Sequence, residues 1–155
     1  MAQAEAMNSD HARIFEEWHR AAMTRDQDAL IALYADDAVL ETPLAPFILP
    51  EQPDGVLRGR AAIKHFLDEG AKRRPNQLVR LQRSGRWFSS GNTLIWEYPR
   101  ETPEGDQIEL IEVMEIVNGL IQRHRIYWGW FGMRQLMNNT MAKDNEADGA
   151  AQNSP

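Results

Sequence analysis

The 155-residue chain contains no cysteine, which excludes disulfides, thiolate nucleophiles and cysteine-based metal sites. It also has no excess of basic residues, because 17 lysines and arginines stand against 23 aspartates and glutamates, so we expect no nucleic-acid partner. We find no secretory signal and no long apolar run, and therefore expect a cytoplasmic protein that does not associate with membranes. A glycine-rich phosphate loop and a serine nucleophile elbow are missing as well.

The chain does have enough apolar sequence, 43% of its residues, to fill the core of one domain. We expect that domain to span residues 10–137. The flanking stretches 1–9 and 138–155 are poor in large apolar groups, and we predict that both are disordered tails.

Three helical patterns come first in the chain. Ser9 or Asp10 can cap a helix whose apolar stripe holds Ile14, Phe15, Trp18, Ala21 and Ala22. The spacing of Thr24 and Gln27 is typical of a capping box and predicts a second, short helix. The third pattern runs from about Arg60 to Arg74 and ends before Pro75.

A segment rich in proline separates the second and third helical patterns. A brief strand, Val39–Glu41, leads into residues 43–53, where four prolines argue against a helix or a central strand. Two interpretations stay open for this segment: a lid folded over the mouth of a pocket, or a loop that packs on its own domain.

The remaining pattern is that of strands, at about Leu78–Phe88, Thr93–Arg100, Asp106–Val117 and Leu120–Trp130. Short turns separate them, so the pattern predicts an antiparallel meander. Helices followed by such a meander indicate an α+β fold, in which a curved sheet wraps around the helices as a cone with a central pocket.

Two turns set the expected register of this sheet. Pro103-Glu104-Gly105 is typical of a three-residue turn with a glycine bulge, and Asn118-Gly119 of a two-residue type I′ turn. Regular pairing from these turns places Glu97 opposite Ile111 and His124 opposite Val113. The concave face should then carry Ile95, Glu97, Ile111, Val113, His124, Ile126 and Trp128.

The opposite face should carry Trp96, Tyr98, Leu110, Met114, Ile116, Tyr127 and an ion pair between Glu112 and Arg125. An exposed aromatic sheet of this size favours association, so we expect a homodimer that covers this face.

Glu97 and His124 are the candidate catalytic residues. A carboxyl group desolvated among apolar side chains should have a raised pKa, which suits Glu97 to proton transfer near neutral pH. His124 could share that proton or orient a ligand, or it could be a hydrogen-bonded core histidine. The residues expected to contact a hydrophobic small molecule are Trp18, Tyr34, Thr42, Phe66, Ile95, Val113, Ile126 and Trp128.

No metal or cofactor is expected. His11, His19 and His65 lie on predicted helices without the spacing of paired ligands, and His65 beside Asp68 and Glu69 fits a solvated helix face.

The chain resembles the nuclear transport factor 2-like superfamily, in particular SnoaL-like polyketide cyclases, limonene-epoxide hydrolases and ketosteroid isomerases. The resemblance covers about Ile14 to Leu136. It is carried by four short segments of this sequence: Tyr34-Ala35-Asp36-Asp37-Ala38-Val39, Gly59-Arg60-Ala61-Ala62-Ile63, Asn118-Gly119-Leu120-Ile121 and Arg125-Ile126-Tyr127-Trp128. These are signatures of a fold, and they say little about the reaction.

The chain departs from each of these families at the positions of their catalytic groups. Ile95 and Ile126 stand where the epoxide hydrolases have an arginine and a second aspartate. Trp18 and Thr42 stand where the isomerases have a tyrosine and an aspartate. Glu112 falls near the second acidic group of the isomerases, which makes it the second-choice site residue.

The resemblance implies a cofactor-independent isomerase, cyclase or lyase that transfers protons on a hydrophobic substrate. Two alternatives stay open: a non-catalytic ligand-binding or dimeric assembly module, and a structural subunit of a larger oxidoreductase.

Overall fold

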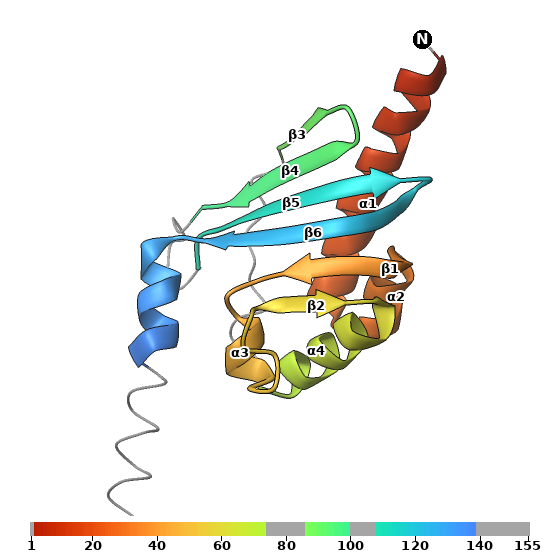
Figure 1. Cartoon of the computed structure of the whole chain (residues 1–155). Helices are drawn as coiled ribbons and strands as arrows, with labels where there is room; N and C mark the ends of the chain where they lie inside the picture. The colour runs from red at the N-terminus through yellow and green to blue at the C-terminus, as the bar shows by residue number, and fades with distance from the viewer. Residues whose placement is uncertain (1, 74–85, 100–107, 139–155) are drawn as a thin grey trace, which may run out of the picture.

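The computed structural model describes residues 2–73, 86–99 and 108–138 (Figure 1). In chain order its labelled elements are α1 (Ala2–Thr24), α2 (Gln27–Ala32), β1 (Tyr34–Glu41), α3 (Ala45–Ile48), β2 (Val56–Arg58), α4 (Arg60–Arg73), β3 (Trp87–Ser90), β4 (Thr93–Tyr98), β5 (Leu110–Val117) and β6 (Leu120–Trp128). Residues 130–138 form a further helix after β6. The predicted α+β fold is confirmed.

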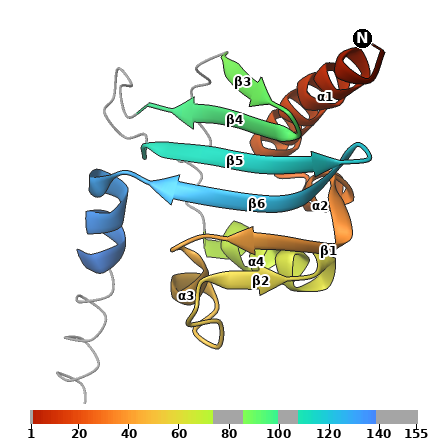
Figure 2. The ribbon, with the colours of Figure 1, turned by 45° about the horizontal axis from the view of Figure 1, so that its top comes forward.

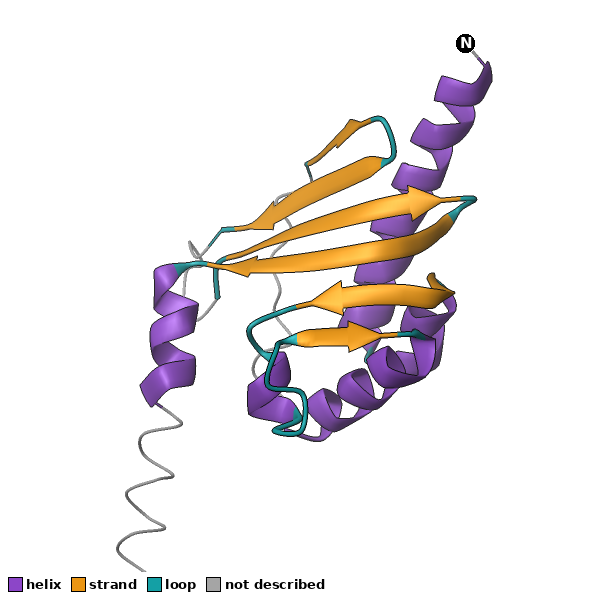
Figure 3. Ribbon diagram, in the orientation of Figure 1, coloured by secondary structure: helices purple, strands orange, loops and turns teal. Residues whose placement is uncertain are grey.

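The strands form one curved, mixed sheet in the order β2-β1-β6-β5-β4-β3. The run from β3 to β6 is the predicted antiparallel meander, and β1 lies parallel to β6 at its side. Helices α1, α2 and α4 lie against one face of this sheet, while the opposite face carries no helix in the described part of the chain (Figures 2 and 3). A helical layer on one face leaves one buried and one open sheet surface.

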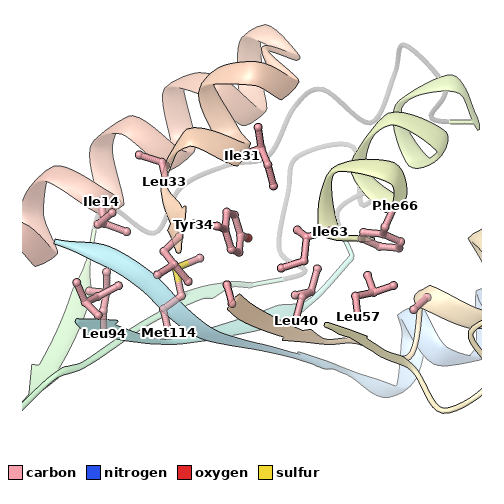
Figure 4. Packing of buried hydrophobic residues seen from close by; sticks show 14 of the residues in the cluster. Ile14, Ile31, Leu33, Tyr34, Leu40, Leu57, Ile63, Phe66, Leu94 and Met114 are labelled. Atoms are coloured by element: carbon pink, nitrogen blue, oxygen red, sulfur yellow. The ribbon is translucent and has the colours of Figure 1, made fainter. Parts of the chain in front are cut away.

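The core lies between the sheet and the helices (Figure 4). Ile14 comes from α1, Ile63 and Phe66 from α4, and Leu94 and Met114 from the sheet, and all five side chains are buried. The apolar stripe predicted for α1 and the third helical pattern, observed as α4, are therefore confirmed. Burial of such side chains is the main source of stability in a domain of this size.

The predicted cap of the second helix is wrong in detail. Asp26, not Thr24, is the N-cap of α2, and its Oδ1 accepts a hydrogen bond from the Ala29 amide at 2.9 Å. Asp and Thr are both good caps, so the local spacing did not decide between them.

The proline-rich segment contains the short helix α3, which we did not predict. Pro46 lies in its first turn, where a missing amide hydrogen costs nothing because that amide has no helical partner. Ala45, Ile48 and Leu49 are buried, and Ile48 approaches Gly70 of α4. In this structure the segment packs on its own domain, so the closing lid stays a prediction.

The bounds of other elements differ from the predicted ones. Helix α1 begins at Ala2, so residues 2–9, predicted as a tail, continue the helix. Strand β1 begins at Tyr34, five residues before the predicted strand, and β2 was not predicted. Three predicted segments lie outside the described residues: the Pro103-Glu104-Gly105 turn, residues 78–85 of the strand predicted at Leu78–Phe88, and the tail after residue 138.

The β5–β6 hairpin decides which side chains face the helices. Its Asn118-Gly119 turn has positive φ at both residues, 51° and 75°, and Val117 pairs with Leu120 as predicted. Beyond the turn Ile116 pairs with Ile121 but Glu115 pairs with Arg123, so Gln122 is an extra residue, a β-bulge. This bulge shifts the rest of the hairpin by one residue.

The shift overturns the predicted faces of β4 and β5. Glu97 does pair with Ile111, but Met114 rather than Val113 pairs with His124. Since alternate residues point to opposite faces, the strands turn their other side to the helices. The side chains predicted to be outside are accordingly buried beneath the helices: Trp96, Tyr98, Glu112, Met114 and Ile116.

No helix in the described residues is both long enough and apolar enough to cross a membrane.

Candidate functional site

Three polar side chains form a continuous hydrogen-bonded chain inside the protein. The Tyr34 hydroxyl lies 2.7 Å from Nδ1 of His124, and Nε2 of the same ring lies 2.5 Å from Oε2 of Glu112. Tyr34 and His124 are 1% exposed and Glu112 is 2% exposed. We call these three residues the triad.

The pairing of β5 with β6 brings Glu112 and His124 of the triad close together. Leu40 of β1 is the partner of His124 on β6, and Ile126 of β6 is the partner of Glu112 on β5. Glu112 and His124 are therefore diagonal neighbours on one face, a separation that long side chains can bridge.

Tyr34 is held at the start of β1 by its backbone. The Arg60 guanidinium of α4 donates to the Tyr34 carbonyl from Nε at 2.9 Å and from Nη2 at 2.6 Å. The same guanidinium contacts Asp36 with Nη1 at 3.0 Å, although that carboxylate is largely exposed. The fork geometry of arginine fixes the strand end from which the tyrosine reaches His124.

Two proton arrangements satisfy both hydrogen bonds of the His124 ring. In the first, the Tyr34 hydroxyl donates to Nδ1, and Nε2–H donates to an ionised Glu112. In the second, a protonated Glu112 donates to Nε2, and Nδ1–H donates to the Tyr34 oxygen, which leaves the phenolic hydrogen free for another acceptor. A neutral imidazole carries one donor and one acceptor in either state, but the second state holds one more proton than the first. A proton taken up at the Tyr34 oxygen, followed by shifts to Nδ1 and to Glu112, converts the first state into the second.

The phenol of Tyr34 is an unusually weak acid here. Burial raises its pKa well above the ordinary value, and the Glu112 charge acts in the same direction, while the Trp18 indole opposes the rise. A free phenolate is therefore disfavoured. The triad avoids a free phenolate if His124 donates a proton to the Tyr34 oxygen as that oxygen gives up its phenolic proton.

A cluster of aromatic rings lies beside His124 of the triad. The Trp18 ring of α1 lies edge-on to His124 with centroids 6.1 Å apart, and Trp96 of β4 lies 5.6 Å from Trp18. Beside them the Tyr98 hydroxyl is 2.7 Å from Nε2 of His19, whose Nδ1 is 2.6 Å from the Phe15 carbonyl. Because only Nδ1–H can bond that carbonyl, Nε2 of a neutral His19 is an acceptor for Tyr98.

The predicted place of Glu97 in the pocket is wrong. Its side chain is exposed on the open face of the sheet, so the desolvation that we expected there is absent. Ile95 and Val113, predicted as ligand contacts, alternate with the buried Trp96 and Met114 and point to the same open face.

The predicted ion pair of Glu112 with Arg125 is wrong as well. Arg125 pairs with Val113 in the ladder, and its Nη2 lies 3.0 Å from Oε1 of Glu115. Glu112 turns inward to His124, as the bulge requires.

The other predicted ligand contacts lie on the helical side of the sheet. Phe66 is buried in the core beside Ile63 (Figure 4). Thr42 is buried, and its hydroxyl accepts a 3.3 Å hydrogen bond from the Leu44 amide at the start of α3. Ile126 packs against the core, and Trp128 follows it on the same face of β6. Their contact with a ligand, like the pocket itself, stays a prediction.

Among the described residues no cluster of three histidine, aspartate or glutamate side chains could hold a metal ion.

Sequence reasoning missed three residues of this interior: His19, Trp96 and Tyr98. A regular register placed both aromatic residues of β4 outside. His19 follows Phe15 by four residues, so the helical period alone could have placed it on the buried stripe.

Residues 15–124 match the model of the SnoaL-like domain family. No curated protein matches the sequence at a significant level.

Solved structures with the same fold come from several bacteria. A nuclear transport factor 2-like protein of unknown function from Burkholderia pseudomallei has a TM-score of 0.63 and 17% identity, over 82% of this chain and 96% of its own. A proposed polyketide cyclase from Sinorhizobium meliloti has a TM-score of 0.53 and 20% identity, over 74% and 94%. A proposed ketosteroid isomerase from Kribbella flavida has a TM-score of 0.53 and 16% identity, over 78% of each chain.

Proposed function

Because the chain belongs to the SnoaL-like domain family, we propose that it is an enzyme that transfers a proton on a hydrophobic small molecule, with the triad as its acid and base. The observation that carries this proposal is the unbroken hydrogen-bonded chain from Tyr34 through His124 to Glu112 in the protein interior. The names of the proposed isomerase and cyclase among the similar structures support it as well.

The proposed step begins with an ionised Glu112 and a Tyr34 hydroxyl that donates to His124. As a carbon next to a ketone loses its proton to the Tyr34 oxygen, the phenolic proton moves to Nδ1 and the Nε2 proton moves to Glu112. The electrons of the broken C–H bond become those of an enolate. No phenolate forms at any stage, which fits the pKa of Tyr34 that burial raises.

The reverse movement returns a proton to the substrate at the same or another carbon. Return to the same carbon is an exchange, and return to another carbon is an isomerisation. The low dielectric of the site strengthens each electrostatic interaction in the triad, because water is excluded from it.

The experiment follows α-hydrogen exchange of 2-tetralone in D2O by NMR. This cyclic ketone is apolar and has acidic α-hydrogens, so it probes the step without knowledge of the natural substrate. We expect the wild-type protein to accelerate exchange and Glu112→Gln to slow it at least about tenfold, since general acid–base catalysis contributes roughly 10²–10⁴. Glu97→Gln is the matched control, because the same change on the open face should leave the rate unaltered.

Two results would contradict the proposal: no acceleration by the wild-type protein, or equal rates for Glu112→Gln and wild type. Binding of 2-tetralone without exchange would favour the ligand-binding module instead. If Glu112→Gln does not fold, Tyr34→Phe interrupts the same chain at its other end and answers the same question.

A further inference from the structure

The two buried tyrosines of this protein have the same kind of partner. The Tyr34 hydroxyl lies 2.7 Å from Nδ1 of His124, and the Tyr98 hydroxyl lies 2.7 Å from Nε2 of His19. All four side chains are buried. A phenol that is hydrogen-bonded to an imidazole nitrogen has a proton acceptor already in place.

The two pairs differ at the far nitrogen of the histidine ring. Nε2 of His124 lies 2.5 Å from Oε2 of Glu112, whose carboxylate can take up a proton. Nδ1 of His19 lies 2.6 Å from the Phe15 carbonyl, which cannot. A proton that enters the His124 ring can therefore leave it on the other side, whereas a proton that enters the His19 ring stays there as a buried positive charge.

A run of aromatic rings connects both pairs with the surface. The Trp18 centroid lies 6.1 Å from that of His124 and 5.6 Å from that of Trp96, and the Trp96 centroid lies 6.5 Å from that of Tyr98. The Trp18 ring is only half-buried. An electron can therefore pass from this cluster to a molecule in solution that never enters the interior.

We propose that Tyr34 is a one-electron redox site, which gives an electron to a strong one-electron oxidant and holds the resulting neutral tyrosyl radical in the interior. The electron leaves the phenol by way of the Trp18 ring, and the oxidant is reduced by one electron. The phenolic proton moves to Nδ1 of His124, and the Nε2 proton moves to Glu112. Only the first of the two proton arrangements allows this step, because only there does Nδ1 carry no hydrogen.

The charge balance of the triad favours this oxidation. Before the step, the triad carries the single negative charge of Glu112. After it, the tyrosyl radical, the imidazole and the carboxylic acid are all neutral. Loss of an electron from a neutral buried group ordinarily leaves a buried cation, which is unfavourable in a low dielectric. Oxidation of Tyr34 removes a buried charge instead.

Oxidation of Tyr98 has the opposite effect on charge. Its proton would move to His19 and create an imidazolium whose far nitrogen faces a carbonyl. The radical should therefore reside on Tyr34, although both tyrosines are buried and both are bonded to a histidine.

This inference goes beyond the proposed function, because it uses the triad without a substrate. A radical that depends on Glu112, in a protein that does not accelerate exchange of 2-tetralone, would keep the redox site and remove the enzyme. Exchange without a radical would do the opposite.

The test generates the oxidant with light. Flash-excited tris(bipyridine)ruthenium(II) loses an electron irreversibly to a cobalt(III) ammine, and the ruthenium(III) complex then oxidises the protein. The radical is measured by transient absorption and by electron paramagnetic resonance of samples frozen after the flash. The chain has three tyrosines, and Tyr127 is 55% exposed. Tyr127→Phe therefore serves as the background in which only the two buried phenols remain.

We expect a long-lived tyrosyl radical in this background protein. Tyr34→Phe should lower its yield at least about tenfold, while Tyr98→Phe, the matched control, should change it less than about twofold, because only Tyr34 is oxidised without leaving a buried cation. Glu112→Gln should also lower the yield at least about tenfold, because an amide cannot take up the proton.

Three results would overturn the inference: a radical that survives Tyr34→Phe, an equal yield in Glu112→Gln, or a tryptophanyl radical in place of the tyrosyl radical. If Tyr34→Phe does not fold, Glu112→Gln decides, since it leaves both phenols in place.

Discussion

Three buried histidines in this protein differ in how their rings are satisfied. His124 and His19 each have a hydrogen-bond partner at both nitrogens. His11, which lies on α1 edge-on to Trp87, has none at either nitrogen within the described residues. A buried imidazole resists protonation, because the charged form loses its hydration.

The burial of the His11 ring predicts that the free energy of unfolding depends on pH. Burial lowers its pKa, while the Asn92 backbone and the Asp10 carboxylate partly oppose the shift. The unfolded chain therefore binds more protons at this site, and stability should fall as the pH drops below the unfolded value of about 6.5. His11→Leu should lose less unfolding free energy than wild type between about pH 7.5 and pH 5.5 in urea titrations.

His65→Leu is the control, because that imidazole is exposed on α4. It should leave the pH dependence of the wild type in place. An unchanged dependence in His11→Leu would mean that another group causes the loss of stability in acid.

At the scale of elements, the bulge at Gln122 has the largest consequence for the site. Without it, the type I′ turn would place Glu112 outside and Glu97 inside, as the sequence predicts from regular pairing. One extra residue brings Ile121 and His124 to the same buried face, although three positions separate them. The composition of the triad is thus set by a backbone irregularity.

Cysteine labelling can test the observed faces, because the chain has no native cysteine. Ile111 is 40% exposed and Met114 is fully buried, the reverse of the predicted arrangement. We expect Ile111→Cys to react with a thiol reagent in the native state, and Met114→Cys to react only after unfolding. Fast labelling of Met114→Cys with protection of Ile111→Cys would restore the regular register.

Local sequence patterns predicted the turn and the helices, but not the bulge. Turn chemistry predicted the Asn118-Gly119 hairpin, and helical periodicity predicted the buried stripe of α1 and the helix α4, because both signals depend on neighbouring residues. The bulge has no such local signature, since Gln122 is an ordinary strand residue flanked by others. His124 was predicted correctly as an inward residue, whereas its partner was assigned to Glu97 because the prediction assumed an uninterrupted ladder.

At the scale of the whole molecule, the open face of the sheet differs from the predicted one. The aromatic residues expected there, Trp96 and Tyr98, are covered by the helices. The face instead exposes apolar side chains from four strands: Phe88, Ile95, Ile111, Val113 and Tyr127. Exposed apolar surface of this kind favours association.

We still expect a homodimer, now through this corrected face. Sedimentation velocity at micromolar concentration should give a dimer for the wild-type chain, and Ile111→Lys should convert it to a monomer, because the new charge would be buried in the interface. Met23→Lys places the same charge on an exposed position of α1 and should remain dimeric. A monomeric wild type, or a dimer that tolerates Ile111→Lys, would contradict this expectation.

The most direct test of the triad is an NMR measurement of the His124 ring itself in protein labelled with ¹⁵N at histidine. We expect both ring nitrogens to share protons with Tyr34 and Glu112, seen as a far-downfield proton that exchanges slowly with water. Glu112→Gln should remove that resonance, and Tyr34→Phe should shift the tautomer of the ring, while Glu97→Gln should change neither. A His124 ring that exchanges its protons freely with solvent, and that responds to none of these substitutions, would contradict the hydrogen-bonded triad.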